Sequence, residues 1–139
     1  MKISAKAEYA CLALVALARQ ASESPPMRIR EISEEFGIPE RYLVQILLRL
    51  KGAGLVTSRR GASGGYHLAR PASAISMAQI LEAIDGPDLS VRASGQANRP
   101  GAAILDPVWD EVRVAERTVL ERTTLAHLAD RAAPHDWSI

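Results

Sequence analysis

The segment RRGASGGYHLARP at residues 59–71 constrains the fold more than any other stretch of this chain, because it is typical of a basic β-hairpin. Arg59 and Arg60 enter its turn. Three glycines, Gly61, Gly64 and Gly65, remove side chains where the backbone must approach something closely. A hairpin of this kind, directly after a helix, is the wing of a winged helix. We therefore expect its glycines to lie against a DNA backbone.

Apolar spacing predicts three helices before this hairpin. The first, over residues 4–19, has a helical repeat formed by Tyr9, Leu12, Ala13, Ala16 and Leu17. The second covers residues 28–36 and ends at Gly37, where a left-handed conformation costs little. The third runs from Pro39, placed at the first helical position, to Lys51, and its inward face carries Leu43, Ile46, Leu47 and Leu50. The second and third helices form a helix-turn-helix, and Val56 begins the first strand of the wing.

The outward face of the third predicted helix suits the major groove of DNA. Arg41, Gln45 and Arg49 recur every four residues and therefore share one face. Arginine pairs with guanine and glutamine with adenine, whereas Arg49, near the far end, is better placed for a phosphate. Tyr42 has two interpretations, a core contact or a phosphate contact. Residues 41–70 contain no acid, and their basic residues are Arg41, Arg49, Lys51, Arg59, Arg60 and Arg70.

The C-terminal half predicts one short helix and one long helix. A Ser-x-x-Gln capping box, Ser76 and Gln79, opens a helix to Asp85 that ends at Gly86. Asp106 and Pro107 supply an N-cap and a first-turn proline for the long helix, whose apolar stripe predicts a dimer seam formed by Val108, Trp109, Val112, Ala115 and Val119. The alternative is that this stripe packs on the chain's own head. We expect residues 124–131 to dock beside the long helix and the last residues to fray.

Length and composition exclude several classes of protein. With 139 residues, 47% of them hydrophobic and 24% charged, the chain has room for one compact head and an extension. One cysteine, Cys11, rules out an intrachain disulfide, and we expect no membrane segment and a cytoplasmic location. We find no pairing of a nucleophile with a base and no metal-ligand spacing, since the histidines are isolated: His67, His127 and His135. The sequence therefore does not predict an enzyme.

Four stretches of the chain resemble the Rrf-two family of bacterial regulators. They are ISAKAEYACLALVALA, REISEEFGIPERYLVQILLRLKGAGLV, the RRGASGGYHLARP wing and SMAQILEAIDG. The resemblance implies a mainly α-helical winged helix-turn-helix with a small β-hairpin wing and a long C-terminal dimerisation helix. It also implies a dimeric repressor on a palindromic double-stranded DNA operator. The predicted DNA contacts are Pro39, Arg41, Tyr42, Gln45, Arg49, Arg59, Arg60, Gly61, Ser63 and Gly64.

The chain departs from the cluster-binding members of that family. Those members carry three cysteines in the loop after the short helix, whereas residues 87–103 here read PDLSVRASGQANRPGAA. Iron-sulfur clusters need thiolate or histidine ligands, so we expect no cluster and no other cofactor. Cys11 in the apolar first helix has two interpretations, packing or redox sensing. Glu8 matches an acidic position that some members use as an extra ligand, but a surface or capping charge is the simpler interpretation.

The expected organisation is a DNA-binding domain at residues 1–86, a flexible loop at 87–103, and a dimerisation helix with a tail at 104–139. The signal is then a small molecule, a partner protein or nothing. An alternative function is a protein-interaction module that kept the fold but lost operator binding. The observation that favours it is Val44, at a place where the iron-sulfur regulator has a base-reading glutamate.

Overall fold

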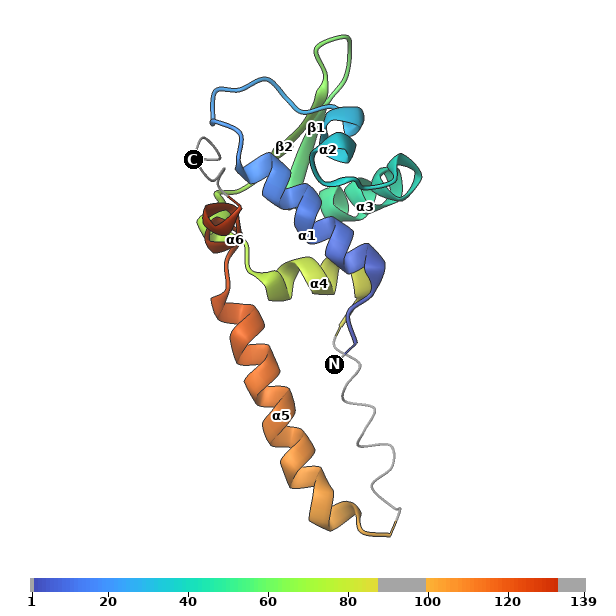
Figure 1. Cartoon of the computed structure of the whole chain (residues 1–139), viewed down its shortest axis with the longest axis vertical. Coiled ribbons are helices and arrows are strands. Elements are labelled where there is room, and N and C mark those ends of the chain that lie inside the picture. The colour runs from blue at the N-terminus through green and yellow to red at the C-terminus, as the bar shows by residue number, and fades with distance from the viewer. Residues whose placement is uncertain (1, 88–99, 133–139) are drawn as a thin grey trace, which may run out of the picture.

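A computed structural model describes residues 2–87 and 100–132 and shows a compact head carried on a long helix (Figure 1). The hairpin and the long helix extend from opposite ends of the head. The elements are α1 (Ala5–Ala18), α2 (Ile29–Phe36), α3 (Glu40–Gly52), β1 (Val56–Arg59), β2 (Gly65–Leu68), the 3-10 turn η1 (Ala72–Ala74), α4 (Met77–Asp85), α5 (Ala102–Arg122) and α6 (Leu125–Arg131). The prediction of a mainly helical winged helix-turn-helix is confirmed.

Local sequence signals set most helix ends in the head. The hydroxyl of Ser4 accepts a hydrogen bond from the Ala7 backbone N–H and caps α1. Gly37 ends α2 with φ of 69°, in the left-handed region. Ser76 and Gln79 form the predicted capping box of α4, in which each side chain accepts a backbone N–H of the other residue. Pro39 is the N-cap residue of α3 rather than its first helical residue, so α3 begins one position later than predicted, at Glu40.

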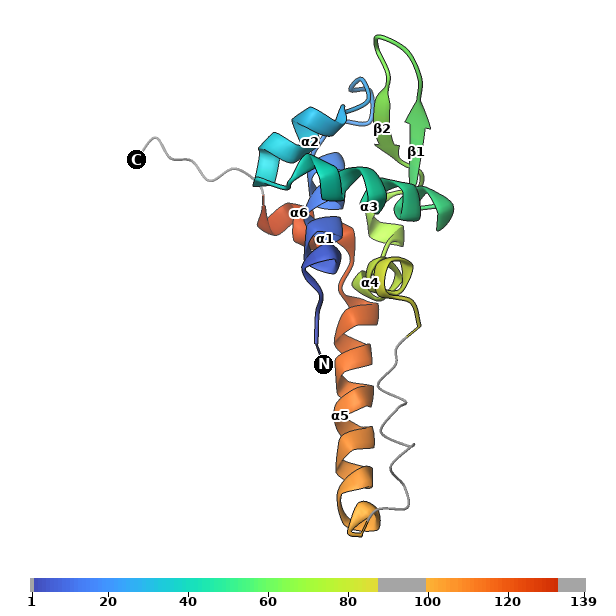
Figure 2. The same ribbon diagram turned by 90° about the vertical axis from the view of Figure 1, so that its right-hand side faces the viewer.

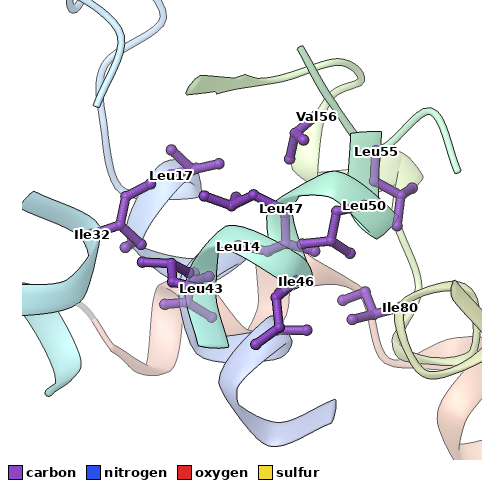
Figure 3. Packing of buried hydrophobic residues seen from close by; sticks show 14 of the residues in the cluster. Leu14, Leu17, Ile32, Leu43, Ile46, Leu47, Leu50, Leu55, Val56 and Ile80 are labelled. Carbon is purple, nitrogen blue, oxygen red and sulfur yellow. The ribbon is translucent and has the colours of Figure 1, made fainter. Parts of the chain in front are cut away.

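The core of the head lies between α1, α3 and α4 (Figure 3). All four predicted inward residues of α3 are buried: Leu43, Ile46, Leu47 and Leu50. In α1, however, Ala7, Ala10 and Leu14 are fully buried, whereas Tyr9 and Leu12 are only partly buried. The buried face predicted for α1 was too narrow. The helix contacts α2, α3, α4, α6 and β2, and a helix enclosed on several sides is apolar almost all round.

The wing is a two-stranded antiparallel hairpin that is fastened to the loop before α2. Val56 pairs with Leu68, and Arg59 pairs with Gly65. Tyr66 exchanges two backbone hydrogen bonds with Met27, of 3.0 Å from the Met27 N–H and 2.8 Å from the Tyr66 N–H. These bonds hold one strand of the wing against the head.

Two of the wing glycines have a requirement within the protein itself. A Cβ on Gly64 would lie 2.3 Å from the carbonyl oxygen of Arg59, and a Cβ on Gly65 would lie 2.4 Å from that of Met27. Both glycines are therefore required by the protein's own backbone, and their approach to DNA stays a prediction. Gly61, with φ of 102° and nothing within 4 Å of its Cβ position, faces open space.

The long helix starts earlier than predicted. It begins at Ala102 after Gly101, whose φ is 83°, so Asp106 and Pro107 lie within the helix and do not open it. A proline six positions into a helix removes one hydrogen bond to the preceding turn. The predicted loop at 87–103 falls mostly on residues 88–99, which lie outside the described residues, as do residues 133–139 at the end of the chain.

The last helix also differs from expectation, because α6 returns to the head instead of running along α5. It packs on α1 and η1, and Leu125 is fully buried in the core of the head. Backbone bonds hold the junction between α5 and α6 against the start of α4, from Met77 N–H to the Thr123 carbonyl (2.9 Å) and from Leu125 N–H to the Ile75 carbonyl (2.8 Å). The lower end of the head and the top of α5 are thereby joined. None of the described helices is apolar over a length that would cross a membrane.

Candidate nucleic-acid interface

The outward face of α3 carries the residues predicted to read DNA bases. Arg41 and Gln45 are both exposed, and Val44 and Leu48 lie on the same side of the helix. Figure 2 shows α3 crossing the head at the base of the hairpin. The structure therefore places the helix that carries the predicted base-reading residues beside the predicted wing.

Tyr42 connects this face to the core. Its ring stacks on Tyr9 with the centroids 6.0 Å apart and the planes 19° from parallel. The guanidinium carbon of Arg41 lies 4.9 Å from the centre of the Tyr42 ring, and one Arg41 nitrogen donates to the tyrosine hydroxyl at 3.3 Å. Tyr42 therefore makes the core contact that was one of its two interpretations. It also orients Arg41 at the start of α3.

The wing offers two unpaired cations to solvent. Arg59 and Arg60 are exposed, as are Gly61 and Ser63, whereas Gly64 is buried beneath the turn. The base of the hairpin is fixed to α3 because Lys51 Nζ donates to Ser58 Oγ at 2.7 Å. The two arginines consequently project from a supported strand.

Arg49 has a partner within the protein. Its guanidinium donates to the carbonyl oxygen of Ile84 at 2.8 Å, so it joins the end of α3 to the end of α4. The sequence did not predict this contact, because nothing in the residues of α3 indicates that a backbone carbonyl of α4 lies within reach of Arg49. A contact between Arg49 and phosphate stays a prediction, as do the other DNA contacts.

The predicted seam of α5 is open to solvent in the single chain. Val108, Trp109, Val112 and Val119 are 42–48% exposed, and Ala115 is exposed between them. Ion pairs of Arg113 with Asp110 and of Arg117 with Glu121 lie along the same helix. The stripe therefore does not pack on the chain's own head, which was the alternative. Further exposed apolar residues on α5 that the spacing missed are Ile104, Leu105 and Val114.

Nothing in the described residues fits a metal or a cluster. No group of three histidine, cysteine or acidic side chains converges there. Burial, followed by the charge of Glu8, raises the pKa of Cys11 from 9.0 to about 11, which disfavours the thiolate that ligation requires. His67 Nε2 lies 3.0 Å from the Ser24 carbonyl oxygen, and His127 Nδ1 accepts the Thr124 N–H in a capping box. Both histidines have structural roles.

A helix-turn-helix followed by a basic hairpin, carried on a long helix with an apolar stripe, defines a winged-helix DNA-binding protein. The sequence profile of the Rrf2 family, described as "Iron-dependent Transcriptional regulator", matches residues 3–131. The chain belongs to this family, the Rrf-two family of the sequence analysis, and it is a DNA-binding transcriptional regulator.

Relatives and solved structures agree with this assignment. A Mycobacterium tuberculosis protein, named provisionally as an HTH-type transcriptional regulator, is 45% identical over 96% of this chain and 84% of its own length. The HTH-type transcriptional regulator CymR of Bacillus subtilis is 36% identical over 93% of this chain and 90% of its length. The solved structure of B. subtilis CymR, titled as the global cysteine regulator, superposes with a TM-score of 0.80 at 32% identity, over 94% of this chain and 98% of that one.

Proposed function

We propose that two copies of this chain join through α5 and bind a palindromic operator as a repressor. The proposal of a dimer rests on the exposed apolar stripe of α5. A second copy that covers these valines and the tryptophan removes their apolar surface from water, which stabilises the dimer. A dimer that occupies an operator overlapping a promoter blocks transcription by excluding the polymerase. Repression of this kind needs only the head and the long helix α5.

In this dimer, each head supplies one α3 and one wing to a half-site. Arg41 and Gln45 contact base edges in the major groove, and Tyr42 keeps Arg41 in place. The wing arginines Arg59 and Arg60 neutralise phosphates, which adds affinity without sequence preference. A twofold axis between the α5 helices sets the half-sites about 34 Å apart, or one turn of DNA.

We further propose that the signal does not act through an iron-sulfur cluster. Residues 87–103 contain no cysteine or histidine, and the one thiol of the chain lies in α1 with a raised pKa. Serine, asparagine and arginine are poor ligands for iron in a cluster. The family description is iron-dependent, so this chain keeps the DNA-binding fold without the donor set. A small molecule or a partner protein is then the signal, or the protein represses constitutively.

Two experiments test these proposals. Purification without oxygen, with an absorption spectrum and an iron assay, should give a colourless protein; a brown product with stoichiometric iron contradicts the cluster argument. Selection from a random duplex library at low ionic strength should enrich an inverted repeat. Enrichment of a single unrepeated site would contradict the dimer, and no enrichment at all would contradict operator binding.

A further inference from the structure

Two aliphatic side chains on the DNA-facing side of α3 remain exposed. Val44 is 45% exposed and Leu48 is 63% exposed. The four inward apolar residues of the same helix are no more than 1% exposed. A lone exposed leucine is ordinary on a protein surface, but these two lie four residues apart, beside Arg41 and Gln45.

The major groove offers one apolar feature to such side chains. Its base edges present hydrogen-bond donors and acceptors, and the exception is the C5-methyl group of thymine. Valine or leucine placed against a polar edge would remove water without replacing its hydrogen bonds, which is unfavourable. The same side chains against a methyl group bury apolar area on both partners.

The spacing of the two residues suits two nearby base pairs. Four residues of α-helix rise about 6 Å, and successive base pairs are about 3.4 Å apart. Val44 and Leu48 can therefore contact methyl groups about two base pairs apart when α3 follows the groove. Gln45 lies next to Val44, and the adenine that glutamine prefers is itself paired with thymine.

We propose that Val44 and Leu48 read the methyl groups of two thymines in each half-site and so make this regulator prefer A·T pairs there. This inference rests on the proposed operator binding. It assigns the exposed pair to DNA rather than to a protein partner, because the pair lies on the face of α3 that carries the two predicted base-reading side chains, and α3 contacts the first strand of the wing.

The test removes the methyl groups and leaves the base pairing unchanged. The best duplex from a random-library selection is remade with deoxyuridine in place of each thymidine, one symmetric pair at a time, and its affinity is measured by fluorescence anisotropy. Each contacted methyl group is worth about fourfold in affinity. We therefore expect two positions per half-site at which deoxyuridine weakens binding, and none outside the half-sites.

Protein variants assign each position. Val44→Ser should weaken binding to the thymidine duplex and abolish the deoxyuridine effect at one position, and Leu48→Ser should do so at the other. Both residues are exposed, so the fold should be retained. Ile3→Ser is the matched control, because Ile3 is 44% exposed but precedes α1, outside α3, the wing and α5, and it should leave both effects unchanged.

The outcomes separate this inference from the proposed function. Tight binding to a selected inverted repeat that is indifferent to deoxyuridine at every position would overturn the methyl contacts and leave operator binding intact. The same holds if Val44→Ser and Leu48→Ser bind as the wild type does but lose a protein partner. If the wild type selects no sequence, the proposed function itself has failed.

Discussion

Gly65→Ala should detach the wing from the head, because the structure leaves no room for a Cβ there. Gly65 has φ of 148°, a conformation that alanine rarely adopts. The added carbon would lie 2.4 Å from the carbonyl oxygen and 2.7 Å from the carbonyl carbon of Met27. Backbone atoms cannot move aside as a flexible side chain can, so β2 must shift away from Met27.

The expected loss of stability follows from the contacts that this shift breaks. Tyr66 and Met27 exchange two backbone hydrogen bonds, and each contributes about 1 kcal/mol to the free energy of unfolding. A non-glycine residue held at positive φ adds at least about 1 kcal/mol of strain. The variant should therefore lose about 3 kcal/mol.

Urea denaturation followed by circular dichroism measures this loss. Gly61→Ala is the matched control, since Gly61 also has positive φ, 102°, but has no atom within 4 Å of its Cβ position. It should lose only the strain, about 1 kcal/mol. Equal losses for the two variants would refute the argument that contact with Met27, rather than backbone conformation, requires glycine at 65.

Three further predictions concern the interface, the seam and the thiol. Arg60→Ala should weaken binding to every duplex and lower the slope of log affinity against log salt by about 1, whereas Gln45→Ala should relax preference at one base pair; equal effects of both on random and selected DNA would contradict their separate roles. Val112→Glu should sediment as a monomer, and a persistent dimer would mean that another face forms the seam. Burial raises the pKa of Cys11 to about 11 from 9.0, so at pH 8 its thiolate fraction, and with it the rate of alkylation by iodoacetamide, should be about a hundredfold below that of an exposed cysteine. The folded state holds this proton more tightly, so stability should fall as pH rises from about 9 to about 11. Rapid alkylation of Cys11 at pH 8 would instead support its interpretation as a redox sensor.

Much of the head could be predicted because its signals are local. Gly37 and the Ser76 capping box act on their own backbone, so helix ends can be identified from a few residues. The inward face of α3 was correct because its outer side carries polar residues and the period is clear. The hairpin could be placed because glycines and arginines concentrate in one short segment.

The errors arose where distant contacts decide the structure. Asp106 and Pro107 look like a helix start, yet Gly101 precedes the helix that contains them. The position of α6 depends on Leu125 entering a core built by α1, which no pattern within α6 encodes. The bond of Arg49 to Ile84 and the contact of Gly65 with Met27 likewise join segments far apart in the sequence.

The central claim is that two heads, joined through their α5 helices about a twofold axis, bind one operator together. The spacing of the half-sites tests it most directly. Five base pairs inserted between the half-sites of the selected inverted repeat turn one half-site to the opposite side of the duplex. Anisotropy titrations at fixed salt should show affinity falling to that of a duplex that carries a single half-site. Unchanged affinity after the insertion would contradict the account.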